Sequence, residues 1–138
     1  MQKVLIVDDD PDIRSLYRLV LHQEGLEVIA AASGQEALSL AEVDIPALVL
    51  LDIMMPDMDG YEVCRRLRAD PRTMDVPVLL FSANGAGSVR DNVRRAGADD
   101  FVTKTAGPRA VAARIHSLLT DVAPSHATVS SSGAGLRR

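Results

Sequence analysis

Polar residues capable of chemistry stand directly after four short apolar runs of the sequence. The runs read VLIV, LVLL, VLLF and FVT, and the residues that follow them are Asp8, Asp9, Asp52, Ser82 and Lys104. Three carboxylates that lie close together repel one another unless a cation or a proton is present. Oxygen ligands without histidine or cysteine suit Mg²⁺, or Mn²⁺, better than zinc. If these residues meet in the fold, we expect a site for a divalent cation.

A site of this composition is suited to phosphoryl transfer. Lys104 adds a positive charge and Ser82 a hydrogen-bond donor, and together with Mg²⁺ they match the three equatorial oxygens of a phosphoryl group in transfer. Asp52 is a candidate nucleophile, because a carboxylate can attack phosphorus and form an aspartyl phosphate. Ser82 is the alternative nucleophile, although no histidine lies near it in the sequence to act as its base.

The elements that must position these residues alternate between two kinds. Short runs rich in Val, Leu and Ile predict buried parallel strands, at residues 4–7, 28–30, 47–51, 78–81 and 101–102. Helical spacing and capping residues predict a helix after each strand, beginning near Pro11, Ser33, Gly60, Ser88 and Pro108. Five strand–helix units in alternation predict an α/β domain with right-handed crossovers. The carboxyl ends of its strands meet at one edge, where such sheets bind ligands.

Composition and charge exclude several classes of protein. The chain has 138 residues and a net charge of −4, with 3% aromatic residues, so direct binding of nucleic acid is not expected. The single cysteine, Cys64, excludes an internal disulfide and a zinc cluster. No segment has the length of a membrane span, and we expect a soluble, cytoplasmic protein. We predict one domain over residues 1–122 and a flexible tail or linker stub over residues 123–138.

Four motifs carry a resemblance to a known family. They read VLIVDDDPDIR, LVLLDIMMPDMDG, VLLFSA and AGADDFVTK, and they occur in the order and spacing of that family. Over residues 3–119 the chain resembles the receiver domain of two-component response regulators, including the single-domain chemotaxis-type regulators. The resemblance implies a flavodoxin-like (βα)5 fold, a three-layer sandwich whose parallel sheet has the strand order 2-1-3-4-5.

The resemblance also implies how phosphorylation proceeds. Asp52 matches the aspartate that accepts a phosphoryl group from the phosphohistidine of a sensor histidine kinase or of a histidine phosphotransfer protein. Asp9 matches a direct Mg²⁺ ligand, whereas Asp8 acts largely through water. Met54 matches the third protein ligand, through its backbone carbonyl. The domain is then a signalling module that catalyses only its own phosphorylation and dephosphorylation.

Further residues match the parts that respond to phosphorylation. Lys104 contacts the phosphoryl group, Ser82 turns toward it, and Phe101 is the switch aromatic. Pro56 and Gly60 shape the loop that follows Asp52. The implied result is a change in a protein-interaction surface formed by the fourth helix, fifth strand and fifth helix, which a downstream protein target would recognise.

The sequence departs from the family pattern at one instructive position. The family usually has a proline after the lysine, joined by a cis peptide bond, but here the residue is Thr105. A cis bond before a residue other than proline costs about 3–4 kcal/mol, so we predict a trans peptide. This change favours, as an alternative, a receiver-like binding module that works without phosphorylation. An aspartyl-phosphate phosphatase is a weaker alternative, because Met54 stands where such enzymes carry a second aspartate.

Other charged residues have simpler explanations. Asp10 is expected to cap the first helix. Four further acids are expected to lie in solvated turns, namely Asp57, Asp59, Asp99 and Asp100. Arg90, Arg94 and Arg95 make the fourth helix basic, and the sequence leaves open whether they form a solvated face or a surface that docks a partner.

Overall fold

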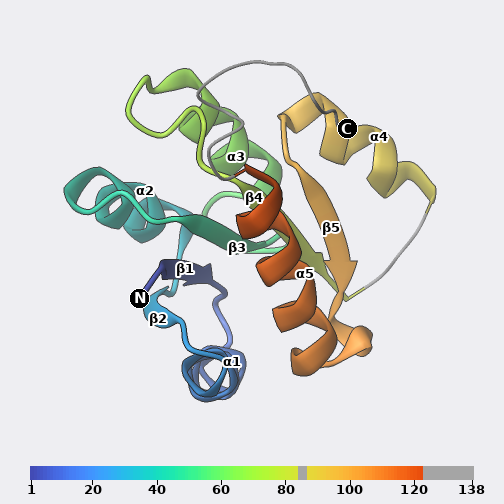
Figure 1. Cartoon of the computed structure of the whole chain (residues 1–138). Helices are drawn as coiled ribbons and strands as arrows, with labels where there is room; N and C mark the ends of the chain where they lie inside the picture. Colours follow the sequence, from blue (N-terminus) through green and yellow to red (C-terminus); the bar gives the residue numbers. More distant parts are fainter. Residues whose placement is uncertain (84–86, 123–138) are drawn as a thin grey trace.

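The computed structural model describes residues 1–83 and 87–122 of the chain (Figure 1). Within these residues strands and helices alternate, as predicted. The elements are β1 Lys3–Val7, α1 Pro11–Gln23, β2 Glu27–Ala31, α2 Gly34–Val43, β3 Leu48–Asp52, α3 Gly60–Ala69, β4 Val78–Ser82, α4 Gly87–Ala96, β5 Asp100–Thr103, a 3₁₀ turn Lys104–Ala106 and α5 Pro108–Val122. The predicted tail at residues 123–138 lies outside the described residues, so the domain boundary stays a prediction.

The five strands form one parallel sheet in the order β2-β1-β3-β4-β5, which confirms the predicted fold. Its two faces are covered by different helices (Figure 1). One apolar cluster joins the sheet to α2, α3 and α4, and the other joins it to α1 and α5. The molecule is therefore a three-layer sandwich with a core on each side of the sheet.

Side chains of the central strands alternate between these two cores. Val4 and Ile6 of β1 face α1 and α5, whereas Leu5 and Val7 face the other three helices. All five residues of β3 and of β4 are buried. Burial of each large aliphatic side chain contributes roughly 1.5–3 kcal/mol, as an upper estimate. Continuous apolar runs are thus explained, because both faces of these strands are covered.

Two predicted helix starts are confirmed by their capping contacts. The Asp10 side chain accepts a hydrogen bond of 2.9 Å from the N–H of Asp12 at the start of α1. At the start of α2, Ser33 Oγ accepts from the Glu36 N–H at 3.1 Å. Helix α4 begins at Gly87, one residue before the predicted start, and α3 extends to Ala69. Such small shifts are usual at helix ends.

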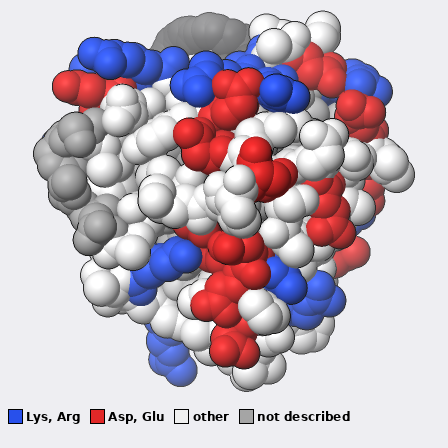
Figure 2. All heavy atoms as spheres, turned by 180° about the vertical axis from the view of Figure 1, so that it is seen from behind, with Lys and Arg blue, Asp and Glu red and all other residues white. Residues whose placement is uncertain are grey.

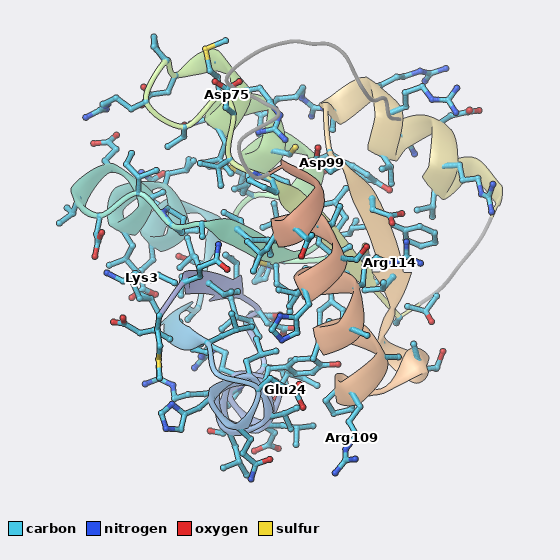
Figure 3. The ribbon with its side chains drawn as sticks, viewed as in Figure 1. Lys3, Glu24, Asp75, Asp99, Arg109 and Arg114 are labelled. Atoms are coloured by element: carbon cyan, nitrogen blue, oxygen red, sulfur yellow. The ribbon has the colours of Figure 1, made fainter. Side chains whose placement is uncertain are left out.

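Of the four aspartates expected in solvated turns, Asp57, Asp59 and Asp99 are exposed and Asp100 is half-buried, but each also accepts hydrogen bonds that organise the fold. Asp59 caps α3, with its Oδ1 2.9 Å from the Glu62 N–H. Asp57 accepts from the first residues of α2, as described below. Asp99 and Asp100 lie at the amino end of β5 and pair with Arg68 and Arg114, respectively; Figure 3 labels Asp99 and Arg114 near that strand. These aspartates thus combine exposure to solvent with contacts to backbone N–H or guanidinium groups.

The surface has patches of both charges. Figure 2 shows many Lys and Arg side chains in a row along one end of the molecule, the end where Figure 1 places α3 and α4. The exposed residues Arg90, Arg94 and Arg95 of α4 form no ion pair with another residue in the described ranges. Whether they dock a partner stays a prediction.

Two further expectations concern single features. Cys64 is fully buried on α3, and burial raises the pKa of its thiol to about 11, which fits a packing residue.

Among the helices of the described part of the chain, none combines the length and apolar character needed to cross a bilayer.

Candidate functional site

The carboxyl ends of the strands bring the predicted residues to one edge of the sheet. Asp8 and Asp9 directly follow β1, whereas Asp52 is the last residue of β3. Ser82 ends β4 and lies in register with Thr103, the residue before Lys104. Four strands therefore deliver their polar residues to the same place, which is the geometry that the sequence predicted.

Three carboxylates form the centre of the site. One oxygen from each of Asp8, Asp9 and Asp52 lies within 4.8 Å of the others. Asp8 is 0% and Asp52 3% exposed, whereas Asp9 is exposed to solvent. Asp8 Oδ1 accepts a hydrogen bond from the Asp10 N–H at 2.9 Å, and Asp52 Oδ1 accepts one from the Met54 N–H at 3.3 Å. The cluster has one open side, at Asp9.

Lys104 reaches into this cluster from the end of β5. Its Nζ lies 2.9 Å from Asp8 Oδ2 and 3.5 Å from Asp52 Oδ1. The same atom lies 5.1 Å from the centre of the Phe81 ring, a position that favours a cation. Burial acts to lower the pKa of Lys104, but the close negative carboxylates of Asp8 and Asp52 outweigh it and raise the pKa. Lys104 is therefore a cation at neutral pH.

One lysine does not balance the buried negative charge. The pKa of Asp52 is raised to about 6, first by burial and then by repulsion from Asp8, against the opposing effects of Lys104 and the Met54 amide. Asp8 Oδ2 is buried, and although Lys104 lies close to it, no donor among the described residues approaches it in good hydrogen-bond geometry. A buried oxygen of this kind calls for a further positive partner. The three carboxylates thus fit a hard divalent cation such as Mg²⁺.

The connection after β5 confirms the prediction for Thr105. No peptide bond within residues 1–83 and 87–122 is cis, so Lys104 and Thr105 are joined by a trans bond. The chain instead forms a 3₁₀ turn over Lys104–Ala106, and the hydroxyl oxygens of Thr103 and Thr105 lie 3.0 Å apart. Lys104 reaches both aspartates from this turn. Phe101 is half-buried and packs against the core on the side of α2, α3 and α4.

Sequence reasoning missed three residues that support the site. Arg14 Nη1 donates to the backbone carbonyl of Asp8 at 2.7 Å, and Phe81 lies beneath Lys104. Asp57 ties the loop after Asp52 to α2. The place of Arg14 in the first turn of α1 was a usable signal, because that turn follows directly after Asp8 and Asp9. The contacts of Phe81 and Asp57 depend on residues distant in sequence, and no local pattern predicts them.

The fold and the acidic site together define a receiver domain. A family model described as the response regulator receiver domain matches residues 4–116, and the chain belongs to this family. It is a signalling module of two-component systems rather than a conventional enzyme. This assignment explains the acidic pocket formed by Asp8, Asp9 and Asp52.

Particular relatives agree with the family. The chain is 40% identical over 137 residues to the probable transcriptional regulator ycf27 of Cyanophora paradoxa, covering 99% of this chain and 56% of the relative. It is 40% identical over 121 residues to the DNA-binding dual master transcriptional regulator RpaA of a Synechocystis strain, covering 86% of this chain and 49% of RpaA. The chain spans about half the length of the curated relatives that it matches.

A solved structure supports the same assignment. Chemotaxis protein CheY4 of Vibrio cholerae superimposes with a TM-score of 0.81 at 28% identity, over 85% of this chain and 98% of that one. The similarity thus includes a chemotaxis protein as well as regulators whose names refer to transcription.

Proposed function

We propose that Asp52 is the phosphoacceptor of this receiver and takes its phosphoryl group from a phosphohistidine. The observation that supports this role is the position of Asp52, buried at the end of β3 with its Oδ1 3.5 Å from Lys104 Nζ. A carboxylate oxygen of Asp52 forms the new O–P bond while the N–P bond of the phosphohistidine breaks. The electron pair of that bond returns to the imidazole nitrogen, which takes up a proton. The donor is a histidine kinase or a phosphotransfer protein.

The other residues of the site stabilise the group in transfer. Lys104 is a cation and lies between Asp8 and Asp52, so it offers positive charge to an oxygen of the phosphoryl group. Ser82 ends the neighbouring strand β4 and offers its hydroxyl to another oxygen. The carboxylates of Asp8, Asp9 and Asp52 and the carbonyl of Met54 would hold Mg²⁺ or Mn²⁺. When bound, the cation supplies charge that neutralises the phosphoryl oxygens.

Neighbouring strands connect the phosphorylation site to the surface. Ser82 is in register with Thr103 of β5, and Phe101 lies two residues before Thr103 on the same strand. We infer that Ser82 and Phe101 act as the switch and alter the face of α4, β5 and α5, which a downstream protein recognises. Residues 1–122 would make up this domain. The expectations of a cytoplasmic location and of no direct contact with nucleic acid stay predictions.

The test is the addition of a phosphoryl group from a small donor. The whole chain is incubated with acetyl phosphate and Mg²⁺ and its intact mass is measured. One phosphoryl mass should be added to the wild type and to the control Asp44→Asn, an exposed acid at the end of α2. The Asp52→Asn variant should gain nothing. A wild-type chain that stays unmodified, while a known receiver is labelled in parallel, would contradict the proposal.

A second candidate function is a binding module that does not need phosphorylation. Thr105 and its trans bond are the features that favour it, because they change the turn that carries Lys104. Retention of a protein partner would then be the same for the wild type, with and without acetyl phosphate, and for Asp52→Asn. The close approach of Lys104 to both aspartates supports the first function instead.

A further inference from the structure

Asp57 makes a contact that the receiver chemistry described above does not use. It lies in the loop of residues 53–59, here called the acceptor loop, which joins β3 to α3. Asp57 Oδ1 accepts from the Gly34 N–H at 3.2 Å, and Oδ2 accepts from the Gln35 N–H at 3.1 Å. Both donors belong to the first turn of α2, 23 and 22 residues earlier in the chain. One carboxylate thus bridges two elements.

The bridge supplies acceptors that the start of α2 lacks. A helix leaves its first four N–H groups without partners inside the helix. The Ser33 hydroxyl accepts from one of them, the Glu36 N–H, whereas the bond from the Ala37 N–H to the Ser33 carbonyl is the first regular bond of the helix. Asp57 accepts from two more, the N–H groups of Gly34 and Gln35. An acidic group is also favoured at this end by the helix dipole.

The charge of Asp57 is suited to this contact. Slight burial acts to raise the pKa of Asp57, but hydrogen bonds from the amides of Gln35 and Gly34 and from its own loop outweigh it and lower the pKa. The carboxylate is therefore ionised at neutral pH, and both of its oxygens accept hydrogen bonds.

Close packing is an independent sign that the acceptor loop is seated on α2. A Cβ atom added to Gly34 would lie 2.8 Å from Val63 Cγ2 and 3.1 Å from Met58 Cβ. Gly34 is buried, and the half-buried Met55 and Met58 pack against the same core. The start of α2 and the middle of the loop are thus in direct contact, and a larger residue at position 34 would separate them.

Apart from those of Asp57, the hydrogen bonds described for the acceptor loop lie near its start and its end. Ile53 donates to the Phe81 carbonyl at 3.0 Å, and Gly60 donates to the Ile53 carbonyl at 2.8 Å. Between them, the hydrogen bonds of Asp57 tie the middle of the loop to an element other than β3 and α3. Pro56 lies next to Asp57, and its fixed φ angle limits the freedom of the backbone back toward Met54.

We propose that Asp57 is a positioning residue for the cation at this site, because its bridge to α2 holds the backbone of the acceptor loop at Met54. The inference rests on the proposed function for the role of the Met54 carbonyl. Asp57 itself touches neither the cation nor the phosphoryl group. Its loss should therefore weaken cation binding and leave the chemistry at Asp52 intact once the cation is saturating.

The test compares two ways of damaging the start of α2. Asp57→Ala removes the bridge, and Asp57→Asn keeps an oxygen that can accept one of the two bonds. Ser33→Ala is the matched control, because it removes a cap from the same helix end without touching the acceptor loop. Binding of Mn²⁺ to each whole chain is measured by electron paramagnetic resonance, without any phosphoryl donor. A folded state is confirmed for each variant by circular dichroism.

The expected result is graded. Loss of a residue that orients a ligand typically weakens metal binding about 10–100-fold, and we expect about tenfold for Asp57→Ala. Asp57→Asn should be intermediate, and Ser33→Ala should bind as the wild type does. With acetyl phosphate, Asp57→Ala should need more Mg²⁺ for half-maximal phosphorylation but should reach nearly the wild-type rate at saturation.

Two outcomes would overturn the proposal. One is Mn²⁺ binding by Asp57→Ala that lies within twofold of the wild type, and the other is an equal loss in Ser33→Ala, which would show a general effect of α2 stability. These outcomes differ from failure of the proposed function, in which the wild type binds Mn²⁺ but accepts no phosphoryl group. A wild type that binds no Mn²⁺ would refute both.

Discussion

Asp52 carries a charge that its surroundings oppose. It is 3% exposed, it faces Asp8, and burial is the first cause that raises its pKa to about 6 from an ordinary value of 3.8. Each unit of raised pKa corresponds to about 1.4 kcal/mol by which folding disfavours the charged form. The difference between the two pKa values therefore corresponds to about 3 kcal/mol. The surroundings of Asp52 thus favour its neutral form. A bound cation would instead stabilise the charged carboxylate.

Because the buried charge of Asp52 is unfavourable, we predict that Asp52→Asn is more stable than the wild type at high pH. Without divalent cations at pH 8, the free energy of unfolding should rise by roughly 1–3 kcal/mol, because the buried charge is gone. Between pH 6 and 4 the native wild type binds more protons than the unfolded chain, so its stability rises as the pH falls. The difference in the free energy of unfolding between Asp52→Asn and the wild type should therefore decrease as the pH falls from 6 to 4.

Urea denaturation at several pH values, with a chelator present, measures the effect. Asp75→Asn is the control, because Asp75 is an exposed acid that precedes β4, at the opposite end of that strand from Ser82, and it should show no comparable difference (Figure 3). An Asp52→Asn variant that is less stable than the wild type at pH 8 would show that Lys104 already compensates the charge.

At the scale of elements, Arg68 joins three segments at the end of the sheet opposite the site. Its Nε donates to the Gly97 carbonyl at 2.8 Å, and its Nη1 donates to the carbonyls of Met74 and Val76 at 3.1 and 2.6 Å. Its Nη2 contacts Asp99 at 2.9 Å, and the same Asp99 oxygen accepts from the Val78 N–H. One side chain of α3 thus organises the starts of both β4 and β5.

We predict that Arg68→Met lowers the free energy of unfolding by about 2–3 kcal/mol. The methionine keeps an apolar stem but leaves several carbonyl groups without this donor and the Asp99 carboxylate without its ion-pair partner. Arg65→Met is the control on the same helix, because the Arg65 side chain is 51% exposed and pairs with Glu62 at the surface. It should cost much less. Equal losses in the two variants, measured by urea denaturation, would contradict this role of Arg68.

At the scale of the whole molecule, the site should link cation binding to folding. The carboxylates come from the ends of β1 and β3, 44 residues apart, so they meet only in the native state. A ligand that binds only the native state stabilises it by RT ln(1 + [L]/Kd), which is about 1.4 kcal/mol at ten times Kd.

The melting temperature should therefore rise with the Mg²⁺ concentration, by roughly 5 °C at ten times Kd. Calorimetry at pH 7.5 measures the shift, and NaCl at matched ionic strength separates specific binding from screening. Asp9→Asn removes one carboxylate of the cluster and should lose most of the effect. A shift that persists in Asp9→Asn would place the bound cation elsewhere.

Local sequence patterns predicted most of the fold. Short apolar runs predicted the parallel strands, because a strand covered on both faces must be apolar throughout. The central strands β3 and β4 are buried as predicted, whereas most residues of the edge strands β2 and β5 are only half-buried. Capping residues such as Ser33 and Asp10 predicted helix starts, since they act within a few residues of their own position. The trans peptide bond after Lys104 was also predicted correctly, from the cost of a cis bond before Thr105, whereas the 3₁₀ turn that it belongs to was not predicted.

The sequence predicted the exposure of Asp57, Asp59 and Asp99 but not the partners that these acids and Asp100 contact. Asp57, Asp59, Asp99 and Asp100 look alike in the sequence, each an acid in a polar loop, and all were assigned to solvated turns. In the structure Asp59 caps its own helix, whereas the other three accept hydrogen bonds or form ion pairs with other elements. Composition gives the polarity of a loop, but partners from distant elements decide what each polar side chain contacts.

Asp52 and its neighbours show what the sequence determined and what only the tertiary structure determined. Sequence pattern was enough to bring Asp8, Asp9, Asp52, Ser82 and Lys104 to one edge, because the direction of parallel strands sends all their carboxyl ends there. The folded chain alone revealed that Asp8 is fully buried, that Lys104 lies closer to Asp8 than to Asp52, and that Asp57 bridges to α2. Strand direction is a local and repeated property, whereas burial and these contacts depend on how several elements pack around one atom.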